Sequence, residues 1–150
     1  MAYPVLNFPP VRLRAARRRG CDYVWDDLRG AWLLLTPEEW VRRHLLGWLR
    51  EGLGVAPTAI VQEYPVALGG TAQRADVVVL DGGQRPLLLA ECKAAGVTID
   101  ARTLDQAVRY NSVVGARYLM LTNGLRHYFY ETADGLIYEP LAAPPDLSGR

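Results

Sequence analysis

The chain has few cysteines, few histidines and no long apolar run. Because no apolar stretch approaches the roughly 20 residues that a membrane-spanning helix needs, we expect no membrane contact. The two cysteines are too few for a disulfide framework, and together with two distant histidines they lack the spacing of zinc ligands. Residues 1–10 do not have the basic and apolar pattern of a secretory signal. The expected compartment is therefore the cytoplasm.

Lysine is also scarce, because Lys93 is the single lysine among the 17 basic residues and all the others are arginines. A phosphate-binding loop needs Gly-Lys followed by Ser or Thr, whereas Lys93 lies between Cys92 and Ala94. This excludes an ATPase site of that type. Because every other basic residue is an arginine, the position of the only lysine is informative about function.

The net charge of +1 gives no general attraction to nucleic acid. Basic residues are nevertheless clustered near the N-terminus, with no acidic residue among them: Arg12, Arg14, Arg17, Arg18 and Arg19. Two interpretations remain open at this point. The cluster is either a solvated basic loop or an arm that contacts phosphates.

The 150 residues fit one domain. Residues 23–35 predict a β-hairpin with a turn of several residues. Thr36 can cap a helix, Pro37 suits its first position and Glu39 completes a capping box, so we expect a helix to about Glu51. A strand is expected over residues 60–68, before Gly69 and Gly70.

Further along the chain, the apolar runs 76–80 and 87–92 predict a second hairpin. A helix over residues 103–114 follows, and then strands over 118–121 and 127–130. This order predicts an α/β fold with a central mixed sheet flanked by helices and an N-terminal β-hairpin. We divide the chain into an N-terminal extension (1–35), a main domain (36–140) and a flexible tail (141–150).

The second hairpin carries charges at the end of an apolar strand. Side chains alternate across a strand, so Glu91 and Lys93 share one face while Ala90 and Cys92 face the core, where Cys92 acts as a small hydrophobe. The hairpin brings Asp76 beside Glu91. Two adjacent carboxylates repel each other unless a cation lies between them, and such oxygen ligands suit Mg²⁺ or Mn²⁺.

Lys93 can hold or relay a proton and orient a water near such a cation, which an arginine cannot do. The alternative is a plain ion pair between Lys93 and Glu91 at the end of the strand, which contributes little.

The pattern of Asp76, a spacer of fourteen residues, and then Glu91, Cys92 and Lys93 resembles the core motif of the PD-(D/E)XK nuclease superfamily. Over roughly residues 35–130 the chain is similar to the N-terminal nuclease domain of type I restriction enzyme R subunits. Ala75 stands where the motif has proline. The resemblance implies a restriction-endonuclease-like core and metal-dependent hydrolysis of DNA phosphodiester bonds.

The family places an acidic residue on the first helix, where Glu38 and Glu39 compete. Glu38 shares a helical stripe with Val41, Leu45 and Trp48 and fits the acidic-x-x-Val-Arg pattern, so we assign it to the site. The alternative role of Glu38 is to complement the helix dipole at the N-terminus.

Two more segments are similar to the family. Gln106 and Tyr110 resemble its Gln-x-x-x-Tyr motif, which implies that they order the site and contact substrate; a surface pair without function is the alternative. Residues 121–125 resemble its strand and turn. His44 and His127 are expected to be structural.

The resemblance implies metal binding by Asp76, Glu91, Glu38 and the backbone carbonyl of Cys92, with Lys93 orienting the attacking water. The residues assigned to phosphate contact are Arg12, Arg14, Arg17, Arg18, Arg19 and Arg109. The expected partners are DNA, a helicase or specificity protein, and a second copy of the chain. Three alternatives remain: a catalytically silent nucleic-acid or protein-binding module, a hydrolase of RNA or of structured junctions, and a dimeric structural protein.

Overall fold

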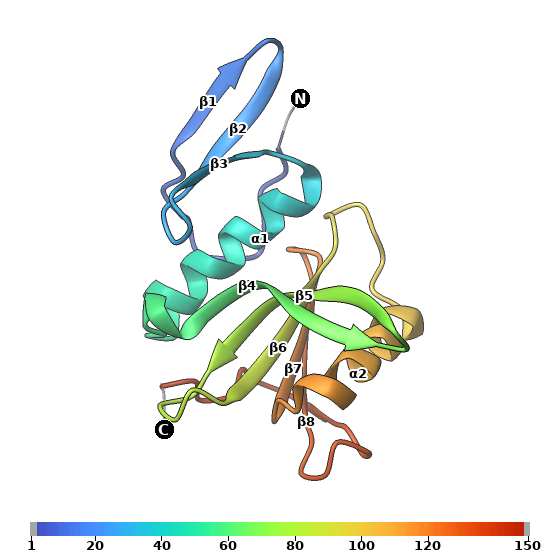
Figure 1. Cartoon of the computed structure of the whole chain (residues 1–150). Coiled ribbons are helices and arrows are strands. Elements are labelled where there is room, and N and C mark those ends of the chain that lie inside the picture. Colours follow the sequence, from blue (N-terminus) through green and yellow to red (C-terminus); the bar gives the residue numbers. More distant parts are fainter. Residues whose placement is uncertain (1–2, 149–150) are drawn as a thin grey trace.

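The computed structural model describes residues 3–148, which form a three-stranded sheet, a six-stranded sheet and two α-helices (Figure 1). The strands and helices are β1 (Ala15–Arg18), β2 (Cys21–Asp26), β3 (Ala31–Leu34), α1 (Pro37–Gly47), β4 (Ile60–Leu68), β5 (Thr71–Leu80), β6 (Pro86–Cys92), α2 (Ala101–Val114), β7 (Tyr118–Thr122), β8 (His127–Glu131) and β9 (Glu139–Leu141). None of the helices in this described part of the chain has the length and apolar character needed to cross a membrane.

The N-terminal sheet is antiparallel, in the order β1-β2-β3. The predicted hairpin is confirmed as β2 and β3. Strand β1 was not expected, because its arginines have no apolar alternation; its backbone pairs with β2, as at Ala16 and Tyr23. Arg19 and Gly20 turn the chain between them with φ of 52° and 77°, the left-handed conformation of a tight hairpin turn. Of the basic cluster, Arg17 and Arg18 therefore lie in a strand, whereas Arg19 is in the turn and Arg12 and Arg14 precede β1.

Helix α1 begins as predicted, since the Glu39 N–H donates to Thr36 Oγ1 at 3.1 Å. The second half of the predicted capping box is wrong. The Glu39 carboxylate binds Arg42 and Arg43 instead, and the Thr36 N–H donates to the Leu34 carbonyl. After Gly47 the helix continues as a π-helical turn, Trp48–Gly52, so the predicted end at Glu51 lies within this turn.

The large sheet has the order β4-β5-β6-β7-β8-β9 and is mixed, because β6 and β7 are parallel and every other pair is antiparallel. The predicted strand 60–68 and the hairpin of β5 and β6 are confirmed. Strand β5 starts earlier than predicted, at Thr71, because its polar first half pairs along β4. Strand β9 was not predicted.

The two helices cover opposite faces of the large sheet. On one face α1 packs Val41 and Leu45 against sheet residues that include Val77. On the other, α2 packs Ala107 and Tyr110 among residues that include the next position of β5, Val78, and Leu89 of β6. Alternation along these buried strands therefore gives each helix its own apolar face, as the predicted flanking arrangement requires.

Both ends of the described chain pack against the body. Leu6 contacts the turn at Gly124, whose φ of 85° suits glycine, and the Asn7 N–H donates to the Gly124 carbonyl at 2.7 Å. Leu147 is 3% exposed and lies in the core on the α1 face. The expected flexible tail 141–150 is thus packed where Leu147 anchors it; residues 149–150 lie outside the described residues, as do residues 1–2 of the extension 1–35.

Candidate active site

The register of β5 and β6 places Asp76 opposite Glu91, since the neighbouring pair is Val77 and Ala90. The Asp76 N–H donates to Glu91 Oε1 at 3.1 Å, and the Cys92 N–H donates to Asp76 Oδ2 at 2.7 Å. Each carboxylate is therefore held by backbone of the facing strand. The prediction that Asp76 approaches Glu91 is confirmed in geometry.

Glu91 is 4% exposed, and its burial together with the nearby Asp76 charge raises the pKa of its carboxyl to about 9, against the opposing effect of Lys93. Without a cation at the site, Glu91 therefore keeps its proton at neutral pH. A buried carboxyl that faces a second carboxylate shows this behaviour when nothing positive separates the two.

Replacing Glu91 by glutamine is expected to stabilise the metal-free protein increasingly as pH rises. Above pH about 4.5 the unfolded chain releases the Glu91 proton while the folded chain keeps it up to about pH 9, so wild-type stability falls across this range. Glutamine does not titrate, so it removes this pH-dependent loss of stability, and its side-chain oxygen can still accept a hydrogen bond from the Asp76 N–H. Urea unfolding in EDTA from pH 5 to pH 9 measures the effect. Parallel curves for the two proteins would contradict it.

Cys92 is 1% exposed and packs in the core on the α1 face, which confirms its expected place. Burial raises the pKa of its thiol, with a further contribution from Asp76. The thiol therefore stays protonated, and the side chain acts as a small hydrophobe beside the carboxylates.

Glu38 and Glu39 differ in their surroundings. The Glu38 side chain is 46% exposed. The pKa of its carboxyl is raised overall, because desolvation and the Asp76 charge outweigh the opposing effects of Arg42 and Lys93. The Glu39 side chain is 13% exposed and is paired with Arg42 at 3.1 Å and Arg43 at 2.9 Å. Glu38 is thus the one with a partly free carboxylate near Asp76 and Lys93.

Arg42 was not among the predicted site residues. Its Nη2 lies 3.3 Å from Asp76 Oδ1, and its guanidinium also pairs with Glu38 and Glu39. The side chain is almost fully buried, and its Nε has no hydrogen-bond partner among the residues that the structure describes. The sequence feature that could have identified Arg42 was its spacing, because it lies four residues after Glu38 on the buried stripe of the helix. Arg42 supplies the positive charge next to Asp76.

Lys93 is half-buried at the end of β6, where its backbone N–H donates to the Thr122 carbonyl at 2.8 Å. Within residues 3–148 its ammonium makes no ion pair with Glu91 or with another carboxylate. The alternative of a strand-end ion pair is therefore wrong. The ammonium is close enough to lower the pKa of both Glu38 and Glu91.

Gln106 and Tyr110 lie one turn apart on α2, and the Gln106 amide donates to the Tyr110 hydroxyl at 3.0 Å. Tyr110 is buried in the core on the α2 face. The structure thus joins the two residues to each other, and neither bonds to Lys93 or to the carboxylates in the described part of the chain.

The predicted phosphate-contacting arginines fall into two places. Arg12, Arg14, Arg17, Arg18 and Arg19 lie on or beside the N-terminal sheet, whereas Arg109 is exposed on α2. Because α2 covers the sheet face opposite to α1, the structure does not bring Arg109 to the N-terminal cluster. Both predicted histidines have structural partners: His44 Nδ1 bonds to the Trp40 carbonyl, and His127 bonds to Thr122 and Asn7.

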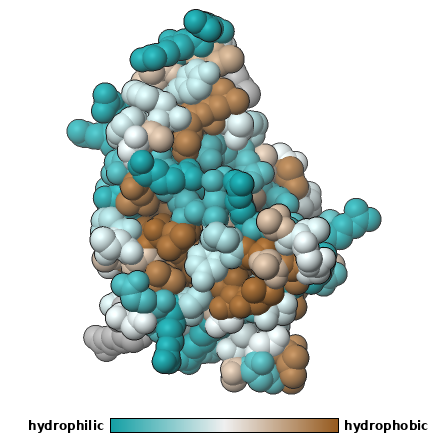
Figure 2. All heavy atoms as spheres, viewed as in Figure 1, coloured by the Kyte–Doolittle hydropathy of each residue, from teal (hydrophilic) through white to brown (hydrophobic). Residues whose placement is uncertain are grey.

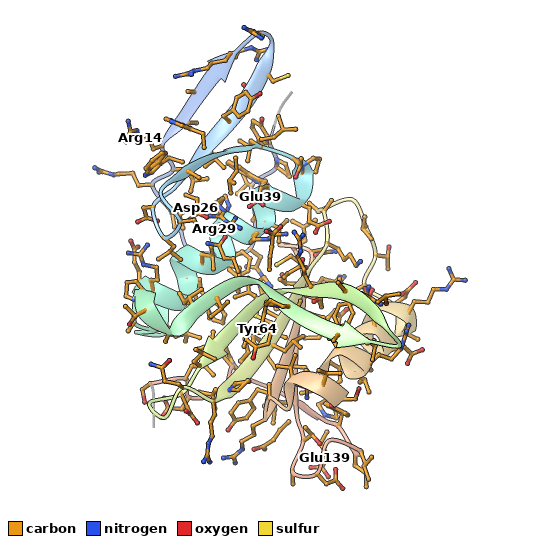
Figure 3. The ribbon with its side chains drawn as sticks, in the orientation of Figure 1. Arg14, Asp26, Arg29, Glu39, Tyr64 and Glu139 are labelled. Atoms are coloured by element: carbon orange, nitrogen blue, oxygen red, sulfur yellow. The ribbon has the colours of Figure 1, made fainter. Side chains whose placement is uncertain are left out.

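A buried ion-pair network, also not predicted, joins the N-terminal sheet to α1. Asp26, at the end of β2, is fully buried and pairs with Arg29 and with Arg43, whose Nη1 lies 3.3 Å away. Arg43 also bonds to Glu39 and to Gln62. Figure 3 shows Asp26, Arg29 and Glu39 close together between the sheet and the helix.

This network continues into the site, because Glu39 binds both Arg43 and Arg42, and Arg42 binds Asp76. Contacts of 2.9–3.3 Å thus connect Asp26 with Asp76 without a break. The N-terminal sheet therefore helps to position the arginine that contacts the site.

Asp76 and Glu91 together offer hard carboxylate oxygens of the kind that Mg²⁺ and Mn²⁺ prefer. The pKa of Glu91 is raised first by burial and then by the neighbouring Asp76 charge, and a bound cation would oppose both effects. The donor set fits such a cation. Within the described residues, no group of three or more His, Cys, Asp or Glu side chains is arranged to hold a metal. Any further ligands would come from backbone, water or substrate.

A scan against protein families matches residues 37–145 to the family described as Type I restriction enzyme R protein N terminus (HSDR_N). The matched range contains Glu38, Asp76, Glu91 and Lys93, and it begins after the N-terminal sheet. A search of curated proteins finds no match. On the family match, the chain belongs to the type I restriction enzyme R protein N terminus family.

Proposed function

We propose that the protein is a cytoplasmic, metal-dependent nuclease of the PD-(D/E)XK type that hydrolyses DNA phosphodiester bonds in restriction, defence or DNA processing. The observation that carries this proposal is the pairing of Asp76 and Glu91 across β5 and β6, with Lys93 two residues further on. Membership of a restriction-enzyme family supports it.

In this proposal Asp76, Glu91 and the Cys92 carbonyl hold Mg²⁺ or Mn²⁺, with help from Glu38. Such a cation supplies polarisation of the scissile phosphate and a more acidic attacking water. Lys93 orients that water and offsets the charge that develops on the phosphate. Arg42 holds the Asp76 carboxylate from the helix side, and Gln106 and Tyr110 order the neighbouring face. Hydrolysis then needs no covalent intermediate.

Base-specific contacts have no evident source in this chain, so arginine contacts to phosphates account for DNA binding in the proposal. Type I restriction enzymes work with motor and specificity functions, and we infer that a helicase or specificity protein selects the target. DNA binding through phosphates predicts a steep loss of affinity as salt rises.

The test is cleavage of supercoiled, linear and single-stranded DNA, with an RNA of matching sequence, by the full chain in Mg²⁺ or Mn²⁺. We expect DNA cleavage with either metal and none in EDTA. The preferred DNA form then separates an endonuclease from an exonuclease. Intact folded protein that cleaves no substrate with either metal would contradict the proposal for the chain alone.

A second candidate is a catalytically silent binding module with the same fold. Arg42 favours it, since its guanidinium already contacts Asp76 Oδ1 and neutralises that carboxylate without a metal. This candidate predicts DNA binding that is the same in EDTA and in Mg²⁺. It also predicts that Asp76→Ala leaves that binding unchanged.

A further inference from the structure

The outer face of the N-terminal sheet is aromatic and basic. Strand β2 buries Val24 and Asp26 completely against the body, so Tyr23 and Trp25 face the other way. The β2–β3 pairing puts Trp32 directly across from Trp25. All three of these rings are only half-buried.

The rings gather on one surface beside Arg14. Trp25 and Trp32 meet edge to face with centroids 5.4 Å apart, and the Arg14 guanidinium lies 5.3 Å from each. Next to them is a pocket of about 440 Å³. Its lining residues are Ala16, Arg18, Arg19, Tyr23 and Trp32.

The charge on this face is unbalanced. Arg14, Arg18 and Arg19 are exposed, and in the described part of the chain none of them pairs with a carboxylate. Arg17, which points to the opposite face of β1, is paired with Asp22 at 3.5 Å. Figure 2 shows hydrophilic residues at the outer tip of this sheet and apolar surface directly below them. The face therefore combines arginines that have no carboxylate partner with half-buried aromatic rings.

We propose that this outer face binds single-stranded nucleic acid, with bases stacked on Tyr23, Trp25 and Trp32 and phosphates at Arg14, Arg18 and Arg19. In a duplex the base faces are covered by their neighbours, and only an unpaired strand offers them to aromatic side chains. A patch that reads phosphates alone needs no such rings. The free arginines select an anionic partner over a neutral apolar one.

This site is separate from the proposed catalytic carboxylates. It lies on β1–β3, before the start of the family match at residue 37, and the β1–β2 hairpin projects away from the large sheet (Figure 1). Binding there needs neither a metal nor cleavage. The inference thus goes beyond the proposed nuclease function and can fail or succeed independently of it.

The test is fluorescence anisotropy of labelled dT20, rU20 and a 20-base-pair duplex with the full chain in EDTA, at fixed low salt. We expect both single strands to bind at least about tenfold more tightly than the duplex. Trp32→Ala is expected to raise the Kd for dT20 by about 5- to 150-fold, which is the range for loss of one base stack. Trp32→Tyr, which keeps an aromatic face, should restore most of the affinity.

Arg117→Ala is the matched control, because Arg117 is also an exposed arginine beside an aromatic ring, that of Tyr118, but it is paired with Glu131 on the large sheet. Its Kd should change by less than about threefold, whereas Arg18→Ala and Arg19→Ala together should weaken binding and flatten its salt dependence. A difference between dT20 and rU20 identifies DNA or RNA as the preferred strand. Equal binding of duplex and single strands that is unaffected by Trp32→Ala would overturn the proposal. Concentration-dependent self-association with no oligonucleotide binding would also overturn it.

Discussion

Replacing Lys93 by alanine is expected to lower the rate of DNA cleavage about 100-fold or more while the fold stays intact. Its ammonium has no carboxylate partner among the described residues, so the substitution leaves no buried charge unpaired. The contribution of Lys93 to the sheet is its backbone N–H bond to Thr122, which alanine retains. The side chain is therefore free for chemistry at the neighbouring carboxylates.

Lys93→Arg separates two roles of the lysine, which are to supply positive charge and to relay a proton. Arginine keeps the positive charge but does not relay a proton, so we expect it to recover little of the activity. Arg85→Ala is the control, since Arg85 is an exposed cation in the turn between β5 and β6. Initial cleavage rates in Mg²⁺, together with thermal melting of each variant, provide the measurement. A Lys93→Ala protein that cuts at the wild-type rate would remove Lys93 from the mechanism.

Replacing Asp26 by alanine is expected to lower the free energy of unfolding by about 3–5 kcal/mol. The substitution leaves Arg43 buried without one of its two carboxylate partners. It also removes the acceptor for the backbone N–H groups of Leu28 and Arg29 in the turn between β2 and β3. Urea unfolding at pH 7 measures the loss.

Asp27→Ala is the matched control at the next position. Its own carboxylate is exposed and its partner Arg50 is partly exposed, so we expect a change within about 1 kcal/mol. The double variant Asp26→Ala with Arg43→Met also removes the guanidinium that has lost its partner, and it should recover part of the stability. An Asp26→Ala protein as stable as Asp27→Ala would mean that the buried network contributes little.

The pH dependence of the same contact has a defined sign. The pKa of the Asp26 carboxyl is lowered in spite of an opposing desolvation effect, because Arg29 and Gln62 donate hydrogen bonds to it and Arg43 lies nearby. Its contribution to stability is therefore present above the ordinary carboxyl pKa and is lost as pH falls through the lowered value. The difference between wild type and Asp26→Ala should accordingly shrink in acid.

Local sequence patterns determined most of the secondary structure. The Thr36 cap, the glycine end of α2 and the apolar run of β6 act over a few neighbouring residues, and the structure agrees with them. The approach of Asp76 to Glu91 follows from the same local logic, because a hairpin between consecutive strands sets their register.

Tertiary structure alone decided the features that depend on residues far apart in the chain. Leu147 is buried because the end of the described chain returns to the α1 face. The Glu39 carboxylate binds Arg42 and Arg43 and does not complete the capping box. Leaving the buried guanidinium groups without a carboxylate would cost more free energy than leaving the exposed helix end without a second cap. The path from Asp26 to Asp76 joins three separate segments, and no short sequence pattern encodes such a contact.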